Sequence, residues 1–156
     1  MTEHLESRAL PYSTRQMFDL VADVARYPEF LPWTQSARVR GRTQIEGGEE
    51  MLADLVVSFK VFRERYTSKV VLTPERGDGS AEVDVDAIDG PFEMLRTNYV
   101  FRPDGPNSCT MDLSVNFAFR NKLLQHAAGL AFGHAISRVS KAFEDRAEQI
   151  YGAPVS

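Results

Sequence analysis

The sequence predicts an α+β fold in which a curved antiparallel sheet of about seven strands wraps around a long C-terminal helix. Between residues 37 and 119, apolar and polar residues alternate along successive segments, which is typical of strands with one buried and one solvated face. Residues 121–151 instead show helical periodicity and end at a glycine. The length of 156 residues suits one domain with its own core. We therefore expect a single domain over residues 1–152 and a short tail over 153–156.

The N-terminal part predicts one strand and two short helices. Residues 5–10 form a strand that is ended by a proline. Ser13 and Gln16 have the spacing of a helix capping box, and the apolar residues after them recur every three or four positions. That first helix should end near residues 23–26, because the residue before a proline avoids helical geometry. Pro28 is placed to open a second short helix over residues 28–31.

Six further strands follow, and their short connections favour a meander. Each has an apolar set that alternates with polar residues. The predicted strands lie near residues 37–42, 51–59, 66–72, 81–87, 95–102 and 110–119.

The terminal helix, residues 121–151, changes character along its length. Its second half is amphipathic, whereas residues 123–136 are apolar on almost every side and should be buried or face an apolar ligand. One helix cannot cover all the apolar surface of such a sheet, so we infer a cavity between them. The small residues of this helix either let a strand approach closely or leave space for a ligand; they are Ala128, Gly129, Ala131, Gly133 and Ala135.

Composition excludes several classes of protein. The formal charge of −4 argues against general affinity for DNA or other nucleic acid, which needs clustered Lys and Arg. A single cysteine, Cys109, excludes an internal disulfide framework and a multi-cysteine metal site. The first residues lack the pattern of a secretory signal. The longest mostly apolar stretch, residues 123–137, is too short and too polar to span a bilayer. We expect a cytoplasmic protein.

Motifs for catalysis or for metal and phosphate binding are lacking, so we expect no enzyme activity, no metal and no cofactor. The three histidines, His4, His126 and His134, are scattered along the chain. Cys109 opens a strand in its buried phase, which favours a small core residue over a nucleophile.

Four apolar or charged features allow both a structural and a functional interpretation. The corner from Phe30 to Trp33 either plugs the end of the sheet or walls a ligand entrance. The hairpin tip with Val61 and Phe62 either tucks inward or forms a gate or membrane contact, since turn tips are normally polar. Glu64 lies on an inward face, where a carboxylate needs an ion pair or a polar ligand group. Gly90-Pro91-Phe92 is either a tight turn with Phe92 in the core or a lid.

An arginine row is expected on the outer face of one strand, at Arg38, Arg40 and Arg42. A solvated face neutralised by an acidic strand is the default interpretation, with Glu82, Asp84 and Asp86 as the acids. An anionic partner, such as lipid head groups or ribosomal RNA, is the sharper alternative.

Several segments of the chain together match a known family: residues 10–13, 17–24, 27–33, 59–60, 63–68 and 90–92, and the terminal helix ending in Tyr151-Gly152. They resemble the coenzyme-Q-binding START-like family of the polyketide cyclase/START superfamily. The resemblance covers nearly the whole chain. Bacterial members are also described as ribosome association toxins, which inhibit joining of the subunits. The family often carries a cysteine after its Leu-Pro-Trp run, where this chain has Thr34.

This resemblance implies a helix-grip fold, as in birch pollen allergens, that holds a hydrophobic ligand. Ubiquinone is the named candidate, bound without catalysis by a carrier or chaperone that supports respiration. The alternative is a ribosome-binding inhibitor of subunit association, the toxin of a toxin–antitoxin pair, and a cyclase or dehydratase ranks last. Peripheral contact with the inner membrane through Val61 and Phe62 stays open. The predicted ligand-binding residues are Phe30, Trp33, Leu55, Val57, Phe59, Phe62, Glu64, Tyr66, Phe92, Tyr99, Phe117, Leu124, Ala128 and Phe132.

Overall fold

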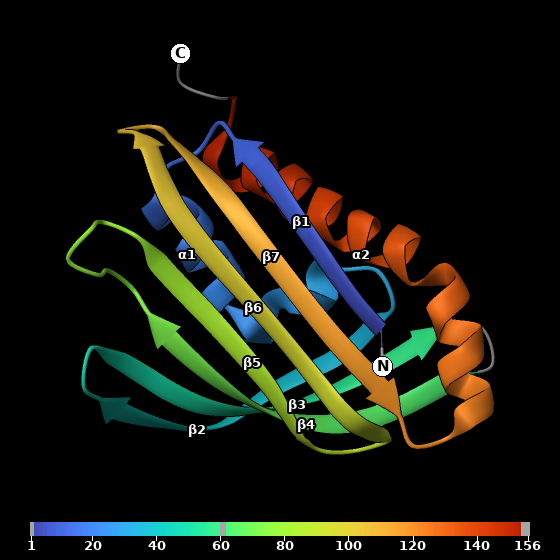
Figure 1. The fold of residues 1–156 in the computed structure, drawn as a ribbon. Helices are drawn as coiled ribbons and strands as arrows, with labels where there is room; N and C mark the ends of the chain where they lie inside the picture. Colours follow the sequence, from blue (N-terminus) through green and yellow to red (C-terminus); the bar gives the residue numbers. More distant parts are fainter. Residues whose placement is uncertain (1, 60–61, 154–156) are drawn as a thin grey trace.

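A computed structural model describes residues 2–59 and 62–153, apart from the side chains of Phe59, Phe62, Ala131 and Phe132. Seven strands, two α-helices and one 3-10 helix follow one another in these residues (Figure 1). Their bounds are β1 (Thr2–Leu10), α1 (Thr14–Ala22), η1 (Val24–Glu29), β2 (Thr34–Ile45), β3 (Gly48–Phe59), β4 (Phe62–Thr73), β5 (Ala81–Asp89), β6 (Phe92–Gly105), β7 (Ser108–Phe119) and α2 (Lys122–Tyr151).

The strands form one curved, unclosed antiparallel sheet in the order β1-β7-β6-β5-β4-β3-β2. The predicted meander is confirmed from β2 to β7, and β1 is added beside β7. All three helices lie on the same side of the sheet, its concave side, and α2 runs alongside β1 (Figure 1). The two edges of the sheet, β1 and β2, are thus far apart in the sheet although they are consecutive strands in the chain.

Local sequence signals set the ends of both α-helices. The Ser13 hydroxyl accepts the backbone N–H of Gln16, and the Gln16 side chain accepts the N–H of Ser13, so the predicted capping box is confirmed. Asn121 caps α2, and the N–H of Gly152 closes its last turn on Glu148. The second short helix was predicted wrongly at residues 28–31. It spans Val24–Glu29 with Pro28 inside, because a 3-10 turn continues directly from α1.

The core lies between the concave face and the helices at one end of the sheet. Phe101 and Met111 from the sheet are fully buried there, together with Met17 of α1 and Phe143 of α2. Tyr27 of η1 packs edge-on against Phe143, with 5.6 Å between the ring centroids. Because α1, η1 and the second half of α2 converge on this region, it has the close packing of a protein interior.

The first half of α2 is much less covered. Leu123 is 82% exposed and Leu130 is 80% exposed, so this half is not buried all round, and the alternative expectation, that it faces an apolar ligand, stays a prediction. Its β1-facing side carries Gly129 and Gly133, where an added Cβ would lie 3.6 Å from Thr2 and 3.9 Å from His4. For these two glycines the structure supports close approach to a strand rather than space for a ligand.

Candidate functional site

The concave face has two ends that differ in how far they are covered. The packed end, defined by Met51, Phe101, Met111, Tyr27 and Phe143, is buried under the helices. The open end lies toward the β3–β4 hairpin and the first half of α2. Its side chains are only partly buried although most are apolar; they are Val57, Glu64, Tyr66, Phe92, Leu95 and Phe119. Apolar surface left accessible on a concave face is the usual lining of a small-molecule site.

A chain of aromatic rings runs across the open end. Tyr66 meets Phe92 edge-on, with the centroids 5.4 Å apart, and Phe92 packs on Phe119 at 4.8 Å. Phe119 in turn contacts Phe117, which is buried, at 5.7 Å. Phe92 is therefore neither a free lid nor a fully buried core residue, but one wall of this cluster.

Gly90 makes that arrangement possible. Its φ of 132° is a conformation that glycine adopts readily and other residues rarely do. A Cβ at this position would also lie 2.6 Å from the Cβ of Tyr66. The chain can therefore pass directly over β4 and place Phe92 against Tyr66. The sequence signal for this contact is the Gly90-Pro91-Phe92 run.

Leu55, Val57, Glu64 and Tyr66 share one surface on neighbouring strands. Leu55 pairs with Tyr66, and Val57 pairs with Glu64. Residues that pair across antiparallel strands project on the same side, so all four face the concave side, as predicted. Within the described part of the chain Glu64 takes part in no hydrogen bond or ion pair, and the ion pair suggested by the sequence is not found there.

Phe30 and Trp33 form the corner between η1 and β2. Phe30 belongs to the packed end, where it contacts Phe143 at 5.5 Å and the guanidinium of Arg146 lies over its ring. Trp33 has a φ of 63°, which is strained for a bulky residue. The guanidinium of Arg138 lies 5.2 Å from the centroid of its ring. This contact ties the β2 edge of the sheet to α2.

The remaining predicted residues have three different positions. Tyr99 is buried against Phe143 at the packed end. Leu124 and Ala128 are partly buried on α2. The side chains of Phe59, Phe62 and Phe132, and the tip residue Val61, lie outside the described residues.

A polar contact zone between β1 and α2, the β1–α2 seam, was missed by sequence reasoning. Ser140 donates a hydrogen bond to the carboxylate of Glu6, and Ser137 donates a longer one at 3.5 Å. Arg8 lies 3.7 Å from Glu6 and 3.2 Å from Glu144. In the sequence these residues are ordinary polar positions of a strand and a helix, and only the packing of α2 on β1 brings them together.

Burial raises the pKa of several groups near the core. It raises the pKa of the Cys109 thiol to about 12, with a further contribution from Asp104, so the thiol stays protonated as expected of a core residue. Burial also raises the pKa of Tyr66 to about 12 and that of Tyr99 further. Both phenols are therefore neutral hydrogen-bond donors near pH 7.

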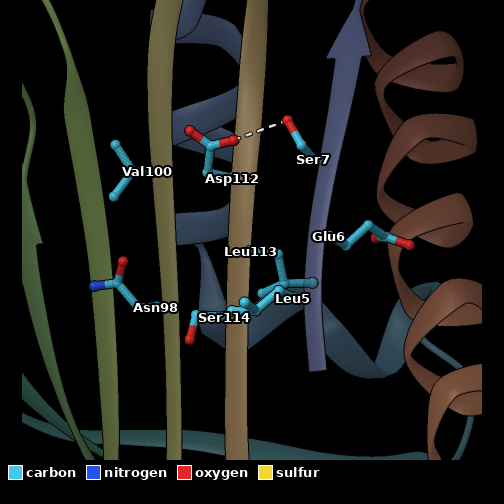
Figure 2. A pocket seen from close by; sticks show the side chains of 8 residues that line it. All are labelled: Leu5, Glu6, Ser7, Asn98, Val100, Asp112, Leu113 and Ser114. Atoms are coloured by element: carbon cyan, nitrogen blue, oxygen red, sulfur yellow. Dashed lines mark hydrogen bonds between the residues drawn. The ribbon is translucent and has the colours of Figure 1, made fainter. Parts of the chain in front are cut away.

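Two hollows lie on the other side of the sheet, its outer face. The larger holds about 410 Å³ and is shown in Figure 2, where Ser7 donates a hydrogen bond of 2.9 Å to Asp112. None of the predicted ligand-binding residues lines it; its lining residues are Leu5, Glu6, Ser7, Asn98, Val100, Asp112, Leu113 and Ser114. The second, of about 350 Å³, is lined by polar and charged side chains of β5, β6 and β7. A cavity between sheet and helix stays a prediction.

The arginine row has a different geometry from the predicted one. A bulge at Arg40 shifts the register so that Arg42 pairs with the buried Met51 and projects to the concave side. Neutralisation by β5 is wrong, because β5 is three strands from β2. Arg40 instead bonds Asp54 of β3 at 2.7 Å. Glu82 and Asp84 of β5 have other partners, among them Arg76, Arg96 and Asn98.

Arg38 stays on the outer face, and two arginines of β4 join it there. Arg38 pairs with Asp54, and Arg63 and Arg65 pair with the next outward residues of β3, Ser58 and Val56. We call Arg38, Arg63 and Arg65 the arginine patch; all three are exposed. A hydrogen bond from Thr67, helped by the nearby guanidinium groups, lowers the pKa of Asp54, which therefore stays ionised beside the patch.

No group of three or more potential metal-binding side chains occurs among residues 2–59 and 62–153. In the same ranges, no helix combines the length and apolar character needed to cross a membrane.

The fold and its concave apolar face define a START-like protein. A solved START superfamily protein from Mycobacterium smegmatis has the same fold, with a TM-score of 0.78 at 16% identity over 95% of this chain and 98% of that one. Residues 10–144 match the family described as polyketide cyclase / dehydrase and lipid transport. The chain belongs to this family, which confirms the fold and the superfamily expected from the sequence.

Two similar proteins have names that point in different directions. "Ribosome association toxin RatA" of Pseudomonas aeruginosa is 34% identical over 97% of this chain and 100% of its own length. "Coenzyme Q-binding protein COQ10 homolog B, mitochondrial" of Xenopus laevis is also 34% identical, over 96% of this chain and 59% of its own. The fold is also shared with the Zhui aromatase/cyclase of Streptomyces sp. R1128, at a TM-score of 0.79 and 13% identity over 95% of this chain and 94% of the other.

Proposed function

We propose that this protein is a non-catalytic carrier that binds a hydrophobic isoprenoid, with ubiquinone as the best candidate, on the open end of the concave face. The observation that carries the proposal is the partly exposed aromatic cluster of Tyr66, Phe92 and Phe119. Complete burial of an exposed side chain of this size gains about 1.5–3 kcal/mol, so a ligand that covers these partly buried rings gains a part of that amount from each. A lipid-transport family and a relative named for coenzyme Q binding support this choice.

A carrier fits this face better than an acid–base enzyme does. General acid–base chemistry needs a titratable group within hydrogen-bond reach of a substrate proton, held by a partner. Glu64 is the carboxylate of the open end, and it has no such partner among the described residues. Glu6 is held by Ser137, Ser140 and Arg8 in the β1–α2 seam, which suits a structural role.

The first test is extraction of the purified full chain with organic solvent, followed by mass spectrometry for isoprenoids, and titration of the chain with ubiquinone. Absence of both co-purified isoprenoid and binding of added quinone would refute the proposal. A matched pair of variants then locates the site on α2. Leu124→Arg should abolish binding because Leu124 is partly buried, whereas Leu123→Arg should not, because Leu123 is 82% exposed.

Ala128→Trp gives an independent check on the same wall. It adds bulk on the partly buried side of α2 and no charge, so it should also block binding while circular dichroism stays that of the wild type. Unchanged affinity in both Leu124→Arg and Ala128→Trp would mean that the ligand does not contact this part of α2.

Binding to a ribosomal subunit is a second candidate function, favoured by the arginine patch on the outer face. Exposed arginines grouped on neighbouring strands are suited to bind the phosphates of RNA. The relative named as a ribosome association toxin matches almost the whole chain. Because the patch and the open end lie on opposite faces of the sheet, one chain can have both activities.

Polysome profiles after overproduction test this second function, since an inhibitor of subunit association should raise free subunits at the expense of whole ribosomes. The double variant Arg38→Gln/Arg65→Gln should relieve the effect. The matched control is Arg15→Gln/Arg26→Gln, which removes two exposed positive charges from the helical side. Leu124→Arg should keep the ribosomal effect if the two activities are separate.

A further inference from the structure

The two most exposed large apolar side chains of the described chain lie on one face of α2. Leu123 and Leu130 are each exposed by 80% or more. About two helical turns separate them, and the exposed Ala127 lies between them on the same face. We call Leu123, Ala127 and Leu130 the leucine stripe, which is about 10 Å long along the helix axis. A single exposed leucine is ordinary, whereas a continuous apolar stripe on a surface is typical of a binding site.

The exposure of the leucine stripe follows from the way α2 rests on the sheet. Gly129 and Gly133 let the helix approach β1 closely, and Figure 1 shows α2 running alongside that strand. The stripe lies on a different side of the helix and points into solvent. In the second half of α2 the same face carries Lys141 and Asp145, which pair with each other at 3.2 Å. The first half therefore presents apolar groups where the second half presents charged ones.

Positive charge flanks the leucine stripe at both ends. Arg120 and Lys122 precede it and Arg138 follows it, and all three are exposed. None of the three forms an ion pair with another described residue. Residues 113–143 contain no Asp or Glu, so this segment is cationic within a chain whose formal charge is −4. Exposed leucines beside cations without acidic partners are typical of a helix that lies in the headgroup region of a membrane.

We propose that the leucine stripe and its three flanking cations form a docking surface for an anionic lipid bilayer, on which the first half of α2 lies parallel to the membrane plane. The leucines enter the boundary between headgroups and acyl chains, and the cations contact lipid phosphates. An RNA partner would use the cations and gain little from the leucines. Because Leu124 and Ala128 on the neighbouring side of α2 are partly buried toward the open end, docking holds that end at the bilayer surface.

The first measurement is flotation of the purified full chain with vesicles, in the absence of quinone. Vesicles of phosphatidylcholine are compared with vesicles of equal parts phosphatidylcholine and phosphatidylglycerol, and the wild type should bind the second kind more tightly. Leu123→Gln/Leu130→Gln should weaken that binding about tenfold or more, because two side chains no longer insert. Arg120→Gln/Lys122→Gln should weaken it about fivefold per charge at low salt, and less at high salt, where charges are screened. Urea midpoints should stay those of the wild type, because all four positions are exposed.

Two further variants separate the leucine stripe from other exposed groups. Leu5→Gln/Ile88→Gln removes two exposed apolar side chains of β1 and β5, and vesicle binding should stay that of the wild type. The arginine patch is the competing cationic surface, and Arg38→Gln/Arg65→Gln removes two of its charges. Vesicle binding should persist in this variant also. If it is lost there and kept in Leu123→Gln/Leu130→Gln, the patch is the docking surface and the proposal is overturned.

A fluorescent label then locates the contact on α2. Cys109 is buried, so a polarity-sensitive thiol label on Ala127→Cys reports on the leucine stripe alone. Its emission should shift to the blue with anionic vesicles, whereas a label on Glu3→Cys, on the outer side of β1, should not respond.

Three results would overturn the docking surface: no binding of the wild type to anionic vesicles, no shift at Ala127→Cys, or a wild-type dimer that Leu123→Gln/Leu130→Gln converts to monomers. The last would show that a second copy of the chain covers the stripe. Because no quinone is present in these measurements, their failure leaves the proposed carrier function standing, and failure of quinone binding leaves the docking surface standing.

Discussion

The packed end and the open end of the concave face are built from the same strands and differ in what covers them. At the packed end, α1, η1 and the second half of α2 bury Phe101 and Phe143 almost completely. At the open end, the first half of α2 rests on β1, and the aromatic cluster around Phe92 stays partly exposed. The contrast teaches that one end of the sheet mainly stabilises the fold and that the other end is left for binding a ligand. Residues of one end should affect mainly unfolding, and residues of the other should affect mainly binding.

The largest expected effect is the loss of a packed-end aromatic ring. Phe143 is 1% exposed and contacts Tyr27, Phe30 and Tyr99 with ring centroids 5.5–5.9 Å apart. Phe143→Ala removes these contacts and leaves a cavity, so the free energy of unfolding should fall by about 3–5 kcal/mol in urea denaturation. A loss below about 1 kcal/mol would show that this end is not the stabilising core.

The second prediction concerns the corresponding ring of the open end. Phe92 is partly buried and packs on Tyr66 and Phe119. Phe92→Ala should lower the free energy of unfolding by only about 1–2 kcal/mol, because the site is already accessible to water. The free energy of ubiquinone binding should weaken by at least the same amount as the free energy of unfolding. If Phe92→Ala loses more stability than Phe143→Ala in the same urea experiment, the assignment of the two ends is reversed.

The sequence predicted the strands well and their partners poorly. Alternation along residues 81–87 and 110–119 is a local property, as is the capping box of Ser13 and Gln16, so both could be recognised without a structure. The bulge at Arg40, by contrast, depends on how β2 pairs with β3, and it moved Arg42 to the opposite face. Register is decided by a partner that the local pattern does not contain.

The candidate site shows the same limit. Its apolar wall was predictable, because Phe92, Val57 and Tyr66 stand in the inward phase of their strands. The polar contacts of the β1–α2 seam were not, since Glu6 fits an ordinary strand pattern. Whether a hydroxyl or carboxylate has a hydrogen-bond partner depends on atoms far away in the chain, as the separation of 134 positions between Glu6 and Ser140 illustrates.

The third prediction addresses how firmly α2 is held at the boundary between the two ends. Glu6 accepts hydrogen bonds from Ser137 and Ser140. Glu6→Gln replaces these charge-assisted bonds with weaker neutral ones, so amide hydrogen exchange over residues 134–141 should become about tenfold faster. Glu3→Gln is the control, because Glu3 is exposed on the outer side of β1. Equal exchange in the two variants would mean that the β1–α2 seam does not restrain the helix.

The smallest expected effect appears at alkaline pH and depends on Tyr66 of the open end. An unfolded tyrosine ionises near pH 10, whereas burial raises the pKa of Tyr66 in the folded chain to about 12. As pH rises above 10 the unfolded state loses this proton first, so stability that is complete below pH 10 decreases until the folded pKa is reached. At pH 11 the loss due to Tyr66 should be about 1 kcal/mol. Tyr66→Phe should therefore lose correspondingly less stability than the wild type between pH 9 and 11 in urea denaturation. An identical loss in both proteins would mean that the Tyr66 hydroxyl is exposed to water in the folded chain.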